Sequence, residues 1–221
     1  NLFLVDIICH GVPSVIIWRE FIKELCYCNG ECVKNISSIA FKYKDTIRKW
    51  NHPGFRVVWK SGQEYIDYSN MSWYENGYLS NLYVRPSCHV CKFKNLNSPS
   101  DLTIGDFWGC ADVLPEMYDE DGVSVVFSKT EKGKEILTWI QNNVDYIQIP
   151  YEIAVKHNSR IIKPTPFNKN RNKFWRYYLR HKEKTMEDME LIVKKCTNKN
   201  IYDHIREKAI YFKRNLWGKL R

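Results

Sequence analysis

The start of the chain constrains the fold most. Residues 2–8 form one apolar run, broken only by Asp6, and pass directly into the turn sequence Cys-His-Gly-Val-Pro-Ser of residues 9–14. Such a run is typical of a central strand that is covered on both faces. Apolar side chains then recur at positions 17, 21 and 25, which predicts an amphipathic helix from an N-cap at Ser14 to about Cys26. The succession of strand, turn and helix predicts an α/β fold.

A β-hairpin interrupts this order. Residues 55–60 and 63–68 are short β-rich runs separated by only Ser61 and Gly62, which is typical of a hairpin connection. The remaining expected elements are strands near 36–44, 101–106 and 123–127, a helix over 130–142 with Ile136, Leu137 and Ile140 facing inward, and a helix with a capping-box start at Thr185. We therefore predict a mixed sheet with flanking helices, a β-hairpin insertion and a helical C-terminal extension.

The composition fits a protein that folds in water without disulfide bonds. With 221 residues, of which 44% are hydrophobic, the chain can bury a core of its own. It contains neither a signal-peptide pattern nor an apolar run near the roughly 20 residues of a membrane span, so we expect a cytoplasmic protein with no membrane span. Its eight cysteines are then expected to be reduced thiols, some free for metal ligation. Because a strand pattern begins directly after Asn1, we expect the chain to continue a longer protein.

Positive charge is concentrated at the C-terminal end. Residues 156–221 contain 19 Lys or Arg and 6 Asp or Glu, whereas residues 1–155 contain 15 and 19. This asymmetry predicts a main domain over 1–165 and a basic helical extension over 166–221. Basic and aromatic residues alternate in part of the extension, as in nucleic-acid or anionic-polymer binders. No nucleic-acid-binding fold signature accompanies them, so we expect Phe174, Trp175 and Tyr178 to pack on the main domain with the cations solvated.

The turn of residues 9–11 is the first candidate site. Ligands of open α/β sheets collect beyond the carboxyl ends of strands, and Gly11 would let a cofactor approach the backbone there. The alternative is that Cys9 is a buried core residue and His10 a hydrogen-bonded polar group at a strand end.

Residues 85–94, Arg-Pro-Ser-Cys-His-Val-Cys-Lys-Phe-Lys, form the second candidate site. The spacing of Cys88 and Cys91 bends two thiolates toward one metal centre, and Arg85, Lys92 and Lys94 would offset an anionic cluster or a phosphate. Three alternatives stay open: a thioredoxin-like dithiol, half of a zinc knuckle, and two unligated surface thiols. The dithiol motif normally opens a helix, whereas the following residues have the composition of a loop.

Residues 100–109 form the third candidate site. A strand ends there at Gly105 and Asp106, followed by Phe107 and Trp108, which suits a flat ring ligand and one polar contact. The alternative is a tight turn filled by the two aromatic rings. Cys26, Cys28 and Cys32 lack ordinary metal-ligand spacing, and Cys196 lies on the apolar face of an expected helix, where core packing is expected.

These three motifs, in this order, resemble the C-terminal domain of the coenzyme F-420 hydrogenase/dehydrogenase beta-subunit family. Each motif is common by itself, whereas the series is specific. Residues 122–126 and 130–135 also match the family's continuation, so the resemblance covers residues 1–165.

The resemblance implies a flavin-containing iron-sulfur protein that passes electrons between a cluster and a flavin or deazaflavin acceptor. It implies Cys9, Cys88 and Cys91 as ligands of one 4Fe-4S cluster, incomplete in this chain, with the fourth ligand supplied by a preceding ferredoxin-like region. Cys110, where the family carries an aliphatic residue, is a candidate substitute. The expected cofactors are the cluster, FAD and coenzyme F-420, and the expected partner is that N-terminal region or a separate redox subunit. The candidate cofactor-binding residues are His10, Gly11, Arg85, Lys92, Gly105 and Asp106.

Two other function classes stay open. The domain could be a metal-stabilised interaction or assembly module in which zinc replaces the cluster. Alternatively, the basic tail could bind an anionic polymer, although we consider nucleic acid the weaker expectation.

Overall fold

The computed structural model describes residues 2–45, 49, 53–68, 72–181 and 184–197. Part of the expected C-terminal extension, residues 182–183 and 198–221, lies outside this range. The helices and strands are β1 (Val5–Ile7), α1 (Val15–Cys28), β2 (Ile36–Tyr43), β3 (Gly54–Trp59), β4 (Glu64–Asp67), α2 (Trp73–Leu79), β5 (Leu102–Asp106), α3 (Cys110–Val113), β6 (Ser124–Ser128), α4 (Glu131–Ile140), α5 (Tyr151–Val155), α6 (Arg171–Arg180) and α7 (Met186–Thr197). The predicted α/β class, with mixed and antiparallel sheets and flanking helices, is confirmed.

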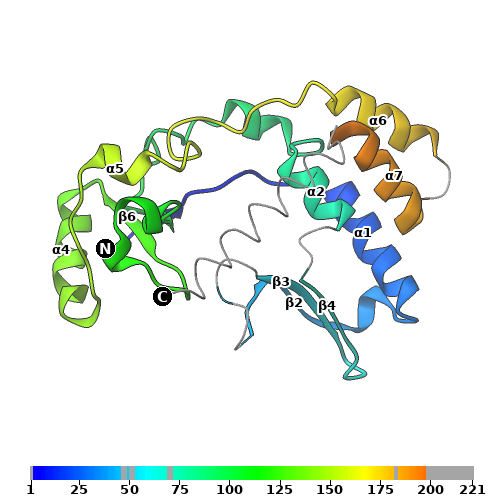
Figure 1. Ribbon diagram of the computed structural model, residues 1–221, viewed down its shortest axis with the longest axis horizontal. Coiled ribbons are helices and arrows are strands. Elements are labelled where there is room, and N and C mark those ends of the chain that lie inside the picture. Colours follow the sequence, from blue (N-terminus) through cyan, green and yellow to red (C-terminus); the bar gives the residue numbers. More distant parts are fainter. Residues whose placement is uncertain (1, 46–48, 50–52, 69–71, 182–183, 198–221) are drawn as a thin grey trace.

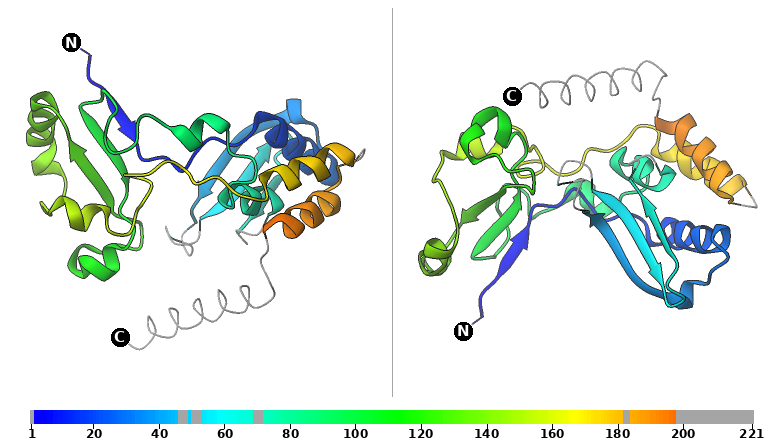
Figure 2. Two further views of the ribbon diagram at one scale, coloured as in Figure 1. Left: turned by 90° about the horizontal axis from the view of Figure 1, so that it is seen from above. Right: turned by 60° about the horizontal axis from the view of Figure 1, so that its bottom comes forward.

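The described chain forms two lobes (Figures 1 and 2). The α1 lobe contains the antiparallel sheet β2-β3-β4 with α1, α2, α6 and α7, and the β5 lobe contains the sheet β1-β5-β6 with α3, α4 and α5. Each lobe has its own cluster of buried apolar side chains. Three segments, residues 8–14, 85–100 and 156–170, run between the lobes, and two of them carry the cysteine motifs.

The hairpin forms as predicted, with β3 antiparallel to β4 and Phe55 opposite Asp67. In the other sheet β1 is parallel to β5, and β5 is antiparallel to β6. The prediction of a central, doubly covered first strand is wrong, because β1 lies at the edge and leaves Val5 48% and Ile7 69% exposed. A continuous apolar run shows that a segment is apolar, but not how many neighbouring strands it finds.

The core of the α1 lobe includes the C-terminal helices. Phe21 of α1 and Trp59 of β3 are buried together with Phe174 of α6 and Ile192 of α7. The expected packing of Phe174 and Tyr178 is confirmed, as is that of Cys196, which is fully buried. The described helices of the extension therefore contribute to the same core as the region before residue 165.

One cation of the extension departs from the expected pattern. Arg171 is buried, donates to the carbonyl oxygen of Leu82 at 3.2 Å, and has a pKa that burial lowers. By contrast, Arg176 and Arg180 are exposed, as expected for the polar face of an amphipathic helix.

Two helix predictions can be checked at their ends. The capping box at α7 is confirmed, since the Thr185 hydroxyl accepts from the Asp188 amide at 3.2 Å. The inward orientation of the last turn of α4 is wrong, because Ile140 is 41% exposed. This helix is anchored near its start instead, where Gly133 is buried and its amide donates to the Thr130 hydroxyl at 3.0 Å.

Candidate functional site

The two cysteine motifs meet because their backbones pair directly. The Ser14 amide donates to the Tyr83 carbonyl oxygen at 2.8 Å, and the Arg85 amide donates to the Val12 carbonyl oxygen at 2.8 Å. An antiparallel bridge between Pro13 and Val84 lies between these bonds. The first connecting segment is thereby fixed beside the start of the second, close to the α1 lobe.

Cys88 is held at this junction. Its Sγ accepts a hydrogen bond from the Val12 amide at 3.3 Å. In iron-sulfur proteins, backbone N–H groups directed at sulfur are among the contacts that set the reduction potential. The 3-10 turn Pro86–Val90 also holds the loop, since the Cys88 amide donates to the Arg85 carbonyl oxygen at 2.9 Å.

Cys9 and Cys88 share a neighbour, Tyr78 of α2. Burial is the main cause that raises the Tyr78 pKa to about 12, and negative charge on Cys9 and Cys88 adds to the shift. The phenol stays protonated at neutral pH and donates to the Gly11 carbonyl oxygen at 2.7 Å. Its ring also lies edge-on to the His10 ring, with centroids 5.0 Å apart. Tyr78 is thus held against the turn that follows Cys9, where charge on Cys9 and Cys88 acts on its hydroxyl.

A complete metal site is not assembled by these thiols. Within the described residues, no group of three His, Cys, Asp or Glu side chains is arranged to hold a metal ion, and this includes Cys9, Cys88 and Cys91. A tetrahedral or cluster site needs at least three protein ligands in one place. The residues present therefore do not fit a preassembled 4Fe-4S centre, and the ligand assignment stays a prediction.

Cys110 is poorly placed as a replacement ligand. It is buried in the apolar cluster of the β5 lobe with Phe107 and Val125, and its thiol points to the Leu114 carbonyl oxygen at 3.6 Å. Burial raises its pKa, which disfavours the thiolate that a metal requires. In the motif at residues 26–32, burial likewise raises the pKa of both Cys26 and Cys28 and so disfavours their thiolates.

The two histidines of the motifs are hydrogen-bonded to neighbouring segments. His10 Nε2 is 2.7 Å from the Asn81 side-chain oxygen, and burial is the main cause that lowers the His10 pKa. His89 Nδ1 donates to the Thr165 carbonyl oxygen at 2.9 Å, which leaves its buried Nε2 without a hydrogen-bond partner in the described structure. A structural explanation of His10, as a polar group satisfied at a strand end, therefore accounts for its contacts.

Gly11 and Gly105, the glycines expected to contact a cofactor, and Gly109 nearby have their side-chain directions filled by the protein. A Cβ at Gly11 would lie 2.7 Å from Val84 Cγ1, and one at Gly105 would lie 2.7 Å from Ile8 Cδ1. At Gly109 a Cβ would overlap the ring of His157. Close packing of the chain on itself is thus a sufficient reason for each glycine.

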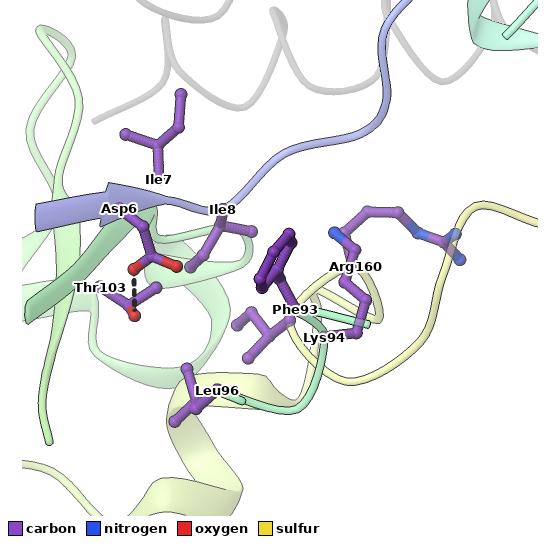
Figure 3. Close-up of a pocket in the computed structure, with 9 residues that line it drawn as sticks. Asp6, Ile7, Ile8, Phe93, Lys94, Leu96, Thr103 and Arg160 are labelled. Atoms are coloured by element: carbon purple, nitrogen blue, oxygen red, sulfur yellow. Dashed lines mark hydrogen bonds between the residues drawn. The ribbon is translucent and has the colours of Figure 1, made fainter. Parts of the chain in front are cut away.

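The hollow at the end of β1 is too small for a flavin ring. Its volume is about 20 Å³, enough for a single water molecule, whereas cofactor pockets hold on the order of 300 Å³ or more. The lining residues are Asp6, Ile7, Ile8, Phe93, Lys94, Leu96, Thr103, Arg160 and Ile161. Figure 3 shows the Phe93 ring between Ile8 and Arg160. Phe93 is 63% exposed, so its ring covers this hollow without being locked into a core.

One carboxylate in the wall of the hollow, that of Asp6, is held by a network of hydrogen bonds. Asp6 accepts from the hydroxyl groups of Ser100, at 2.8 Å, and Thr103 (Figure 3). Burial acts to raise the Asp6 pKa, but bonds from Ser98, Thr103 and Ser100 and the charge of Lys129 outweigh it, so that the pKa is lowered. Asp6 therefore remains ionised, and the network stabilises the β5 lobe at the point where β1 joins it.

The predicted polar cofactor contacts are dispersed. Arg85 and Lys92 are exposed, whereas Lys94 is half-buried and donates to the Cys9 carbonyl oxygen at 2.6 Å. Asp106 forms an ion pair with Lys42 of β2 at 2.8 Å. Cofactor binding by these residues stays a prediction.

Sequence reasoning missed three residues that shape the junction: Tyr78, Asn81 and Thr165. Tyr78 and Asn81 contact His10 and Gly11, and Thr165 contacts His10 and His89. None lies in a motif, and the proline on each side of Thr165 is the one local signal in the sequence.

Comparison with known proteins indicates a family for this chain. Residues 1–150 match the family model described as the C terminus of the coenzyme F420 hydrogenase/dehydrogenase beta subunit. No curated protein matches the chain. A solved structure, the xenon-derivatised F420-reducing NiFe hydrogenase complex of Methanosarcina barkeri, contains a chain that aligns with 16% identity and a TM-score of 0.38.

That alignment covers 83% of this chain and 53% of the solved chain, so this chain spans about half the length of the protein it matches. At this TM-score the structural likeness contributes nothing to the assignment, which depends on the family model alone. None of the helices in the described part of the chain is long and apolar enough to cross a membrane. The chain belongs to the family of C-terminal domains of coenzyme F420 hydrogenase/dehydrogenase beta subunits.

Proposed function

We propose that this chain is the C-terminal module of an electron-transfer oxidoreductase subunit, in which an iron-sulfur cluster exchanges electrons with a flavin or deazaflavin acceptor. The observation that supports the proposal best is the hydrogen bond from the Val12 amide to Cys88 Sγ, which joins motifs 76 residues apart. Cys9 lies two residues before Gly11, where an added Cβ would be 3.5 Å from Cys88 Cβ. Family membership is consistent with this role.

In this proposal the module supplies part of a cluster site. Cys9, Cys88 and Cys91 are the proposed thiolates, and the fourth ligand comes from another part of the subunit or from a partner. A bound cluster would supply one-electron transfer, and the flavin would supply hydride chemistry. The chain's own contribution is to orient Cys88 through the Val12 amide and to hold the turn after Cys9 through the Tyr78 hydroxyl, which donates to the Gly11 carbonyl oxygen. Lys94, which is tied to the Cys9 carbonyl oxygen, adds positive charge beside the thiolates.

The flavin would need more room than the hollow in Figure 3 offers. We place it beside the turn of residues 9–11 and the hollow in Figure 3, where Phe93 would have to move before an isoalloxazine ring could enter. FAD is the proposed resident cofactor, and coenzyme F-420 is one candidate acceptor. The proposal therefore requires that the remainder of the subunit completes the flavin pocket.

The test is anaerobic purification of the full-length subunit with iron, sulfide and flavin quantified together. We expect about four irons per protein and a bound flavin in the parent protein, and loss of most of the iron in Cys88→Ser. Cys28→Ser is the matched control, because Cys28 is an exposed thiol of the α1 lobe. A parent protein with neither iron nor flavin, or equal iron loss in both variants, would refute the proposal.

A second candidate, a zinc-stabilised interaction or assembly module, is favoured by one observation. The hollow near the cysteine turn has the volume of one water molecule. A module without flavin needs no larger pocket. Metal analysis of the same preparation decides between the two, since one zinc per protein without flavin would support this candidate. Polymer binding through α6 is less well supported, because Phe174 and Tyr178 are buried and are not available for stacking with bases.

A further inference from the structure

Residues 158–168, within the third connecting segment of residues 156–170, lie outside the region that the family model matches, yet they are built into the cysteine junction. Ile161 is 2% exposed and Thr165 1% exposed. The Ile161 carbonyl oxygen accepts from the Asn95 amide at 2.8 Å, a few residues beyond Cys91. This segment is therefore packed against the loop that follows the second cysteine motif.

Thr165 bonds to both cysteine motifs at once. Its hydroxyl donates to the carbonyl oxygen of His10, the residue after Cys9. Its own carbonyl oxygen accepts from Nδ1 of His89, the residue after Cys88, at 2.9 Å. The Thr165 hydroxyl oxygen also lies 3.4 Å from the position that a Cβ at Gly11 would take. One buried residue is thus hydrogen-bonded to the residue that follows each of the two cysteines.

These bonds add a restraint that the backbone pairing does not supply. The pairing of Val12 with Arg85 fixes the two motifs on the α1-lobe side of the cysteines. Thr165 acts instead on the residue directly after each cysteine, His10 and His89, and the His89 ring is further held edge-on to Phe167 with centroids 5.3 Å apart. A threonine hydroxyl that is nearly inaccessible to solvent has no competing water, so its bond is kept in the folded state.

We propose that Thr165 is a positioning residue that sets the relative placement of Cys9 and Cys88. What the two thiols then bind depends on the function proposed above, but the placement itself does not. The segment at 158–168 is accordingly part of the site and not a linker between a main domain and an extension.

The test uses the metal-free, reduced full-length protein and iodoacetamide as the probe, with alkylation of each cysteine followed by peptide mass spectrometry. Loss of one hydrogen bond that keeps a segment closed should raise its open population about fivefold. We expect Thr165→Val to accelerate alkylation of Cys9 and Cys88 by about that factor, and Thr165→Ser, which keeps the hydroxyl, to restore the parent rates. Thr138→Val is the matched control, because Thr138 is exposed on α4 and its hydroxyl donates to the Lys134 carbonyl oxygen.

Alkylation of Cys196, buried in the α1 lobe, separates a local effect from general unfolding. Equal acceleration at Cys196, or unchanged rates at Cys9 and Cys88, would overturn the inference. If Thr165→Val does not fold, His89→Phe removes one of the two bonds while keeping a ring beside Phe167, and it should accelerate the same two cysteines.

The iron-loaded full-length protein gives the second readout. There, Thr165→Val should shift the reduction potential of the cluster and Thr165→Ser should not. An iron-free parent protein would refute the proposed function while leaving the alkylation result valid. An iron-loaded parent whose potential and alkylation rates are unchanged by Thr165→Val would refute this inference alone.

Discussion

Substitution of Gly11 by alanine measures whether the turn beside Cys9 is shaped by the protein or left open for a ligand. The added methyl group would lie 2.7 Å from Val84 Cγ1 and 3.5 Å from Cys88 Cβ. Gly11 also has a φ of +157°, which L-residues rarely adopt. The cost of the substitution therefore has two parts, overlap with Val84 and backbone strain.

The two parts have comparable size. Overpacking of a buried position costs about 1–3 kcal/mol, and a sparsely populated backbone conformation costs about 1–3 kcal/mol. Gly11→Ala should thus destabilise the protein by about 2–6 kcal/mol. Val84 is fully buried, so Val84→Ala should itself cost about 2–3 kcal/mol. In the double variant the new methyl group occupies space that the Val84 side chain has vacated. The double variant should therefore be destabilised by about 1–3 kcal/mol less than the sum of the two single substitutions.

The assay is urea unfolding of the parent, the two single variants and the double variant, compared at constant m-value. Gly62→Ala is the matched control for strain, because Gly62 has a φ of +89° and no atom within 4 Å of its Cβ position. Its effect should add to that of Val84→Ala without coupling.

Additive costs for Gly11→Ala and Val84→Ala would refute the reasoning, since they would mean that the methyl group does not meet Val84. If Gly11→Ala also cost no more than Gly62→Ala and removed flavin from the full-length subunit, the space beside Gly11 would belong to a cofactor.

Three further predictions test the hollow, the Asp6 network and the C-terminal helices. Phe93→Ala should raise flavin occupancy of the full-length subunit with little change in unfolding free energy, because the ring is 63% exposed and lines the hollow. Tyr27→Ala, at 79% exposure, is the control. Lower flavin occupancy in Phe93→Ala would contradict the proposed flavin site. The lowered Asp6 pKa contributes stability that is present above the usual value of 3.8 and is lost as pH falls below it, so unfolding free energy measured in urea should decline less steeply with acid in Asp6→Asn than in the parent. Ile192→Ala should destabilise the α1 lobe by about 2–5 kcal/mol. Leu191→Ala should have little effect, because the Leu191 side chain on the same helix is 47% exposed. If hydrogen exchange changes only in α7, the extension folds separately.

Local periodicity was sufficient to predict much of the secondary structure. The four-residue spacing of Ile17, Phe21 and Leu25 predicts α1, and the Ser61-Gly62 connection predicts the β3-β4 hairpin, because these features depend on neighbours in sequence. The Cys and Gly motifs were likewise sufficient to indicate the family. What they could not reveal is the number of neighbours that β1 finds, since an apolar strand has the same sequence pattern at an edge as in the centre of a sheet.

Tertiary structure alone decided what surrounds the motifs. The same glycine pattern is compatible with a cofactor or with a close protein contact, and the structure places Val84 against Gly11 and Ile8 against Gly105. Thr165 lies 155 residues from its hydrogen-bond partner His10, so no local pattern could connect them. The sequence by itself determined which segments are apolar, turn-forming or rich in thiols. Which of these segments share a buried space was determined only when the three connecting segments packed together, because burial and hydrogen-bond satisfaction depend on contacts between residues far apart in the chain.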